Sequence, residues 1–113
     1  MKIASIYKDL EYNPKRPSVS ILFETDFTKE LRIAMQKGTV MKEHRTKYPI
    51  VVAVLEGDID FGVQGQTHKL LSGDLITLHG DVPHDLKANA NSIVRLTLAK
   101  FDDTERVREI VAN

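Results

Sequence analysis

Residues 38–57 read GTVMKEHRTKYPIVVAVLEG, and this stretch decides the fold class of the chain. Its second half, Ile50 to Leu55, is apolar at every position and rich in β-branched side chains. Such a run is typical of a strand that is buried on both faces. Gly38 and Gly57 bound the stretch and indicate a turn on each side of it. We therefore expect a buried strand and, leading into it, a more polar segment that contains His44.

Apolar and polar residues alternate in several segments on both sides of this strand. A period of two is the pattern of strands that bury one face. Turn residues such as Gly57, Gly65 and Gly73 separate these segments at short intervals. Many short strands separated by turns predict an all-β fold, an antiparallel β-barrel or jelly roll. The expected strands are 18–24, 31–36, 50–55, 59–63, 67–71, 75–78 and 92–100.

The N-terminal segment does not follow this pattern. Residues 1–17 end in a stretch that contains Pro14 and Pro17, and proline disfavours regular structure. We expect residues 1–17 to form an N-terminal arm and residues 18–101 to form the barrel.

The C-terminal segment, residues 102–113, changes from a period of two to helical spacing. Val107, Ile110 and Val111 recur at this spacing, and Asp102 with Glu105 resembles a capping box. We expect a short helix, from about residue 103 to residue 112, that packs on the outside of the barrel and covers an apolar patch.

Size and composition narrow the function classes. A chain of 113 residues is one domain, and its 16 basic and 16 acidic residues cancel. A balanced charge gives no general attraction to nucleic acid or to an anionic membrane, so neither is expected as a partner. The chain has no cysteine, which excludes thiolate chemistry and is consistent with the cytoplasm. We expect a cytoplasmic protein, since no apolar run reaches the length of a membrane span.

Two histidines carry most of the functional signal. His44 precedes the buried strand, and His84 follows the turn at Gly73 and the irregular loop 79–83. Two imidazoles delivered by separate hairpins can meet inside a small barrel, where they could hold a metal ion or a small acidic ligand.

The spacing of these residues resembles the cupin superfamily, whose small β-barrels contain two motifs. The first cupin motif runs from a glycine through His-x-His and a glutamate to a second glycine. Here Gly38, His44 and Gly57 match, while Thr46 stands at the second histidine and Ile50 at the glutamate.

The second cupin motif runs from a glycine through Pro-x-Gly to a histidine. Gly73 and His84 match it, while His79 replaces the proline and Asp81 replaces the glycine. The chain thus resembles small single-domain cupins with a degenerate metal motif, over about residues 30 to 100.

The resemblance implies a metal site built from these motif positions. Metal-binding cupins use both histidines and the glutamate of the first motif with the histidine of the second, and here only His44 and His84 remain. They are the predicted ligands of a divalent ion such as zinc, nickel, iron or manganese, with His79 as a weaker third candidate.

Side-chain alternation predicts which residues would surround a small-molecule ligand. If His44 points inward, then Lys42, Thr46, Ile50 and Val52 point inward as well. We expect these four residues to line a mostly apolar pocket.

Three functions remain open from the sequence. The first is a cupin-type barrel that binds a small molecule in a pocket centred on His44 and His84. The second is a metal-dependent cupin enzyme, dioxygenase-like or isomerase-like, with an incomplete ligand set. The third is a non-catalytic dimeric scaffold. A homodimer is expected in each case, because a small barrel covers only one face of the strand at 50–55, and a monomer in light scattering would contradict this.

Overall fold

A computed structural model of the protein describes the backbone of residues 1–101 and 104–112 and the side chains of residues 1–101 and 107–111. Strands dominate these residues, and one helix follows them near the C-terminus. In chain order they are β1 (Ser18–Glu24), β2 (Thr28–Met35), β3 (Val40–His44), β4 (Ile50–Glu56), β5 (Asp58–Val63), β6 (Gln66–Leu71), β7 (Leu75–Leu78), β8 (His84–Ala88), β9 (Ser92–Ala99) and α1 (Thr104–Ala112).

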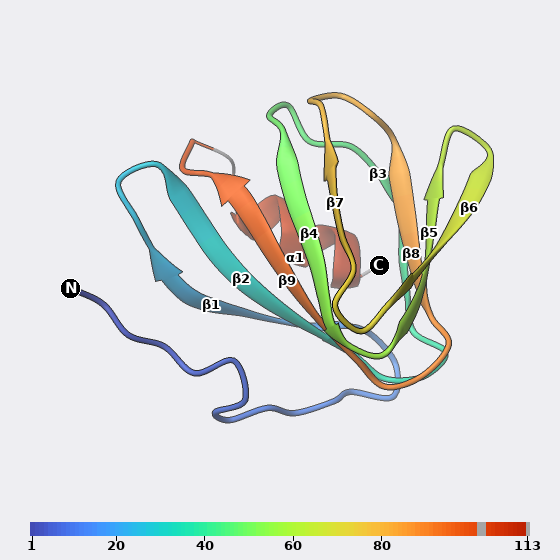
Figure 1. Ribbon diagram of the computed structural model, residues 1–113, viewed down its shortest axis with the longest axis horizontal. Coiled ribbons are helices and arrows are strands. Elements are labelled where there is room, and N and C mark those ends of the chain that lie inside the picture. The colour runs from blue at the N-terminus through green and yellow to red at the C-terminus, as the bar shows by residue number, and fades with distance from the viewer. Residues whose placement is uncertain (102–103, 113) are drawn as a thin grey trace.

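The strands form two antiparallel sheets that face each other. One sheet has five strands in the order β1-β2-β9-β4-β7, and the other has four in the order β3-β8-β5-β6. Figure 1 shows the two sheets meeting at the lower turns and diverging above them. The prediction of an all-β barrel or jelly roll with a short C-terminal helix is therefore confirmed.

The core lies between the two sheets and follows the predicted alternation. On β2, Leu31, Ile33 and Met35 are at most 2% exposed and point toward the opposite sheet. Phe61 on β5 and Leu86 on β8 meet them from the other side and are also buried. A slip of one residue in any of these pairings would turn the apolar row outward, so burial fixes the register.

Strand β4 keeps one face in the core. Ile50, Val52 and Val54 are 3% exposed or less, as the alternation predicts. Val51, on the opposite face, is 39% exposed within this single chain. The second face of this apolar strand is therefore only partly covered here by the chain itself.

Strands β3 and β8 were not among the strands expected from the sequence, although they carry the two histidines. They pair with each other, and the register shifts between Met41 and His44. This irregularity adds a residue to β3, so that Met41 and His44 both reach the interior. A strand with this interruption and several charged residues shows no clean period of two.

The N-terminal arm lies against the outer face of the five-stranded sheet, along the bottom of Figure 1. Arg32 on β2 is 4% exposed and donates hydrogen bonds to the carbonyl oxygens of Ile6 at 2.9 Å and Lys8 at 2.8 Å. A hydrogen bond to the Glu56 carboxylate raises the pKa of the Tyr7 hydroxyl above its usual range. These polar contacts hold a segment without regular structure in place.

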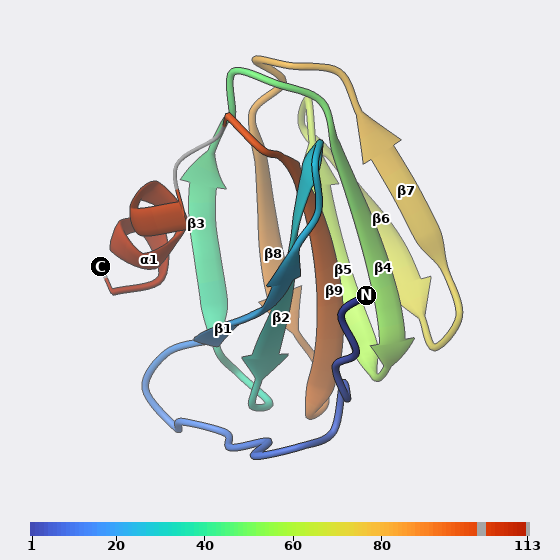
Figure 2. The same cartoon turned by 90° about the vertical axis from the view of Figure 1, so that its left-hand side faces the viewer.

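Helix α1 packs along one side of the barrel, where it contacts β3 and β1. Figure 2 shows it beside β3, at the open side between the two sheets. Val107 and Val111 are buried, and Ile110 packs against the core. The helix was expected to cover a patch on the outside of the barrel, but Val107 reaches the interior. The predicted capping box cannot be compared, because Asp102 and the Glu105 side chain lie outside the described residues. In the described part of the chain, no helix is both long and apolar enough to cross a membrane.

Candidate functional site

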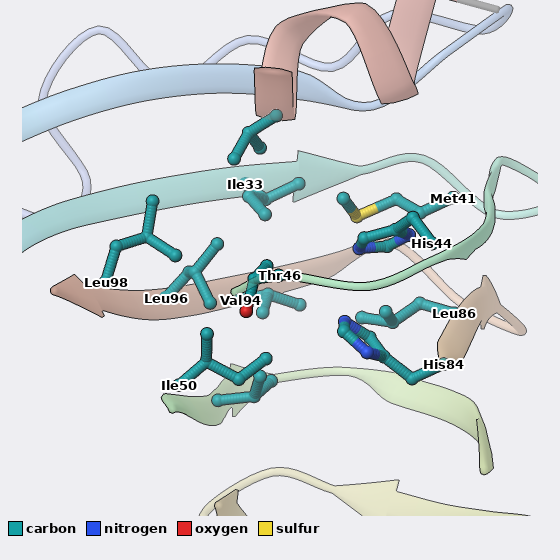
Figure 3. A pocket seen from close by; sticks show the side chains of 12 residues that line it. Ile33, Met41, His44, Thr46, Ile50, His84, Leu86, Val94, Leu96 and Leu98 are labelled. Carbon is teal, nitrogen blue, oxygen red and sulfur yellow. The ribbon is translucent and has the colours of Figure 1, made fainter. Parts of the chain in front are cut away.

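A cavity lies inside the barrel between the two sheets, and Figure 3 shows the side chains that line it. The volume in which the centre of a water molecule can lie is about 20 Å³. This is enough for about one water molecule. The lining is apolar except for two imidazoles and one hydroxyl. It consists of Ile33, Met41, His44, Thr46, Ile50, Val52, His84, Leu86, Val94, Leu96, Leu98 and Val107.

His44 and His84 meet at one end of this cavity. They are direct partners in the register of β3 and β8, so their side chains project from adjacent strands on the same face. Their ring centroids are 4.3 Å apart, with an angle of 61° between the ring planes. Figure 3 shows both rings pointing into the cavity, with Leu96 and Leu98 farther along it.

Hydrogen bonds to the backbone orient both imidazoles. The Nδ1 atom of His44 lies 2.6 Å from the Lys42 carbonyl oxygen, and Nδ1 of His84 lies 3.0 Å from the carbonyl oxygen of Val82. Because a carbonyl oxygen only accepts, each Nδ1 carries the proton and donates it. In the neutral rings the lone pair is then on Nε2, the atom that can accept a hydrogen bond or bind a metal ion.

Phe61 forms the wall behind His84. The two rings are stacked, with centroids 5.5 Å apart and 9° between their planes. Phe61 is 1% exposed and His84 is 3% exposed, so both rings are held by the surrounding core. The position of His84 is therefore fixed by the Val82 carbonyl on one side and by this stack on the other.

The loops that follow β3 and β7 close the end of the barrel near the histidines. The Asp81 amide donates a hydrogen bond to the Thr46 carbonyl oxygen at 2.6 Å. The Thr46 hydroxyl, which is buried, donates to the carbonyl oxygen of Tyr48 at 2.7 Å. Gly80 lies so close to the Lys47 carbonyl oxygen that a Cβ atom would overlap it. The loops that join the histidine strands to the rest of the barrel thus pack directly on each other.

The residues present do not form the complete metal site of the cupin motifs. Thr46 uses its hydroxyl proton in the bond to Tyr48, and the Ile50 side chain has no atom that binds metal. Among the described residues, no group of three or more His, Cys, Asp or Glu side chains is placed to hold an ion. Metal sites in proteins normally have three or four protein ligands, whereas this cavity offers two nitrogens.

Three of the four predicted ligand-binding residues, Thr46, Ile50 and Val52, line the cavity with His44 and His84. The fourth, Lys42, was expected to point inward, but it is exposed and does not belong to the lining. The register shift in β3 explains the difference, because it puts Met41 in the inward position.

His79, the weaker candidate for a metal ligand, is also exposed and outside the lining. It precedes Gly80, whose close packing against Lys47 fixes the path of this loop. The structure therefore brings His44 and His84 together and leaves His79 apart from them.

Several residues of the site had no role in it predicted from the sequence, among them Met41, Phe61 and Val107. The bulge that turns Met41 inward leaves no signal in the sequence. Alternation along β5 does put Phe61 in the core, but it cannot tell which ring stacks on a histidine. The helical spacing of Val107 marks an apolar face without saying that this face reaches the cavity.

The fold and the site define a small double-sheet β-barrel with a histidine-containing interior cavity. The family model described as "Cupin domain" matches residues 31–100. The chain belongs to the cupin family, as the motif spacing predicted. A search of curated protein sequences finds no match.

Solved structures similar to this chain have the same fold. An RmlC-like cupin protein from Desulfovibrio desulfuricans has a TM-score of 0.80 at 20% identity, covering 88% of this chain and 96% of that one. A Thermus thermophilus protein has a TM-score of 0.77 at 20% identity, with coverage of 88% and 98%. A conserved protein of unknown function from Streptococcus pyogenes has a TM-score of 0.75 at 17% identity, with coverage of 88% and 87%.

Proposed function

We propose that this cupin binds a small, largely apolar molecule whose one polar group hydrogen-bonds to the His44 and His84 imidazoles. The observation that carries the proposal is the convergence of both rings, 4.3 Å apart, on a single apolar cavity. A ligand pocket commonly combines an apolar lining with a few polar groups that fix orientation. Here the two imidazoles provide those polar groups.

The imidazoles determine which polar groups fit. With both rings neutral, each Nε2 accepts a hydrogen bond, so a hydroxyl or a protonated carboxyl group can donate to it. If one ring takes up a proton, the pair becomes a donor to a carboxylate, and such charge-assisted bonds are the stronger ones. A ligand with a short aliphatic or aromatic body and a hydroxyl or carboxyl group satisfies both the lining and the histidines.

The test compares three probes that share a ring and differ in their polar group: benzoate, benzyl alcohol and toluene. We expect benzoate or benzyl alcohol to shift the ring signals of His44 and His84 in nuclear magnetic resonance spectra, and toluene to bind more weakly. His84→Ala should weaken binding about tenfold or more, since a lost hydrogen bond in a buried site costs about 1–3 kcal/mol.

His79→Ala provides the matched control, because this histidine is exposed and lies outside the cavity lining. It should leave binding unchanged. Equal binding of all three probes, or an equal loss in both variants, would contradict the proposed role of the imidazole pair.

A metal-dependent enzyme, dioxygenase-like or isomerase-like, is the second candidate. One observation favours it: both Nδ1 atoms bond to backbone carbonyls, an arrangement that histidine ligands of metals commonly have. In that case zinc, nickel, iron or manganese would be found by elemental analysis of protein purified without chelator. His44→Ala would then remove the metal.

We also propose a homodimer that uses the outer face of β4 and β7, where Val51 is 39% exposed and Leu75, which pairs with Ala53, is 67% exposed. If the protein is instead a non-catalytic dimeric scaffold, its function would depend on this face alone. The histidine substitutions would then change only the stability of the protein. The proposed location is the cytoplasm, since a chain without cysteine needs no oxidising compartment.

A further inference from the structure

We infer that α1 is the movable cover of the histidine cavity, and that a ligand reaches His44 and His84 by displacing Val107. The inference rests on the proposed function, because it concerns access to the same cavity. It follows from a comparison of what closes the cavity on each of its sides.

The side beneath α1 is a gap between the two sheets. β1 and β3 are the edge strands of their sheets there, and α1 contacts both of them. Val107 is 3% exposed and belongs to the cavity lining together with His44 and His84. Figure 2 shows the helix lying along this side of the barrel. One helical side chain therefore forms part of the cavity wall.

The end of the barrel near the histidines is closed by backbone. The Asp81 amide bonds to the Thr46 carbonyl oxygen, and Gly80 packs against the Lys47 backbone without room for a Cβ atom. Opening this end would break the hydrogen bond that the buried residue Thr46 accepts from the Asp81 amide and would separate two loops that fit closely. Leaving a backbone group of a buried residue unpaired is costly.

The opposite end is closed in the same way. The Gly38 amide bonds to the Ala88 carbonyl oxygen at 2.8 Å, and the Ala88 amide bonds to the Thr39 carbonyl oxygen at 3.0 Å. On the remaining side, between β6 and β7, the surface has a groove that is lined by His68, Ile76 and Phe61. The buried Phe61 ring separates this groove from His84. Access from either direction would require the core or the sheet ladder to open.

The contacts of α1 are of a different kind. Among its described residues, the side chains that pack into the barrel are apolar: Val107 and Val111 are buried, and Ile110 packs against the core. Arg108 and Glu109 are exposed and have interaction partners of their own. A helix of nine residues is marginal by itself in water, so its order depends on this packing. Segments with few buried apolar contacts open locally before the rest of a domain does. The α1 side is therefore the one that opens most easily.

This arrangement has a consequence for the ligand. The closed cavity has room for about one water molecule. A ligand with an apolar body must take the volume that Val107 occupies, so binding and helix docking compete. Access of such a ligand to the His84 imidazole, which is 3% exposed, is then governed by the docking equilibrium of α1.

The test measures access to each imidazole by its rate of modification with diethyl pyrocarbonate, mapped by mass spectrometry. His68 and His79 are exposed and serve as internal references, while His84 is 3% exposed. The reagent needs no bound ligand or metal. A failure of the proposed binding function would therefore leave this test intact.

We expect Val107→Asp to raise the modification rate of His84 about fivefold or more, with unchanged rates at His68 and His79, because a buried carboxylate drives the helix off the barrel. Val40→Asp is the control, since Val40 lies on β3 and is 46% exposed. It should leave all rates unchanged. If Val107→Asp does not fold, Val107→Ala decides, with an expected increase of about twofold to threefold at His84.

Gly80→Ala tests the competing route through the loops, because its Cβ atom would push them apart. The inference predicts a smaller increase at His84 in this variant than in the Val107 variant that folds. It would be overturned by a His84 rate that rises in Gly80→Ala and stays at the wild-type value in the Val107 variant. A folded Val107 variant with no increase at His84 would overturn it as well.

Discussion

Phe61→Ala is expected to lower the free energy of unfolding by about 3–5 kcal/mol, as is typical for removing a buried aromatic ring. Phe61 is 1% exposed and belongs to the central apolar cluster. Its loss would leave a cavity beside the His84 ring, because the two rings are stacked at 5.5 Å. Chemical denaturation monitored by circular dichroism measures the effect. The His84 ring would also lose the stacking contact that helps to orient it.

Phe27→Ala is the matched control, since it makes the same substitution at a ring that is 75% exposed. A surface change of this kind should alter stability by less than about 0.5 kcal/mol. If Phe61→Ala also changed the free energy of unfolding by less than about 0.5 kcal/mol, the packing around His84 described above would be wrong.

Gly57→Ala should be the second severe change, with an expected loss of about 2–4 kcal/mol. Gly57 has a φ angle of 121°, which side chains rarely adopt, and a Cβ atom there would come within 2.6 Å of the Ser92 Cα atom. Ser92 is fully buried, and its hydroxyl accepts a hydrogen bond from the Asp58 amide at 3.1 Å while donating to Ala90. The substitution would therefore disturb the turn between β4 and β5 and the start of β9 together.

Gly65→Ala separates the cost of the positive φ angle from the cost of the contact with Ser92. Gly65 also has a positive φ angle, 78°, but a Cβ atom there would meet nothing within 4 Å. Its expected cost is about 1–2 kcal/mol, from the backbone conformation alone. Equal losses in the two variants would show that the contact with Ser92 contributes nothing.

Much of the fold could be predicted from the sequence because the core strands follow simple burial patterns. Ile50, Val52 and Val54 repeat every second residue, and this alternation matches the buried face of β4. The turn glycines mark the limits of the neighbouring strands. The start of β2 was predicted three residues too late, at residue 31, because the strand begins at Thr28 in a polar segment. Thr28 pairs with Ala99 on β9, which is far away in the sequence. Such a long-range pairing leaves no local pattern.

The site could be predicted only in part. The spacing of the cupin motifs indicated His44 and His84, and the structure brings these two residues together. Lys42 was placed inward by strict alternation, and the irregularity between Met41 and His44 changes that order. Val107 could not be assigned to the cavity, because helical spacing gives the apolar face of α1 but not the surface on which it docks.

The central claim is that the imidazoles of His44 and His84 face one another within a single cavity. It is tested most directly by nuclear Overhauser contacts between the carbon-bound ring protons of the two histidines in the folded protein. The geometry, with ring centroids 4.3 Å apart, predicts clear contacts between these rings and also between His84 and Phe61. Contacts from His84 to Phe61 without any to His44 would contradict the claim, because the β3 imidazole would then lie outside the cavity.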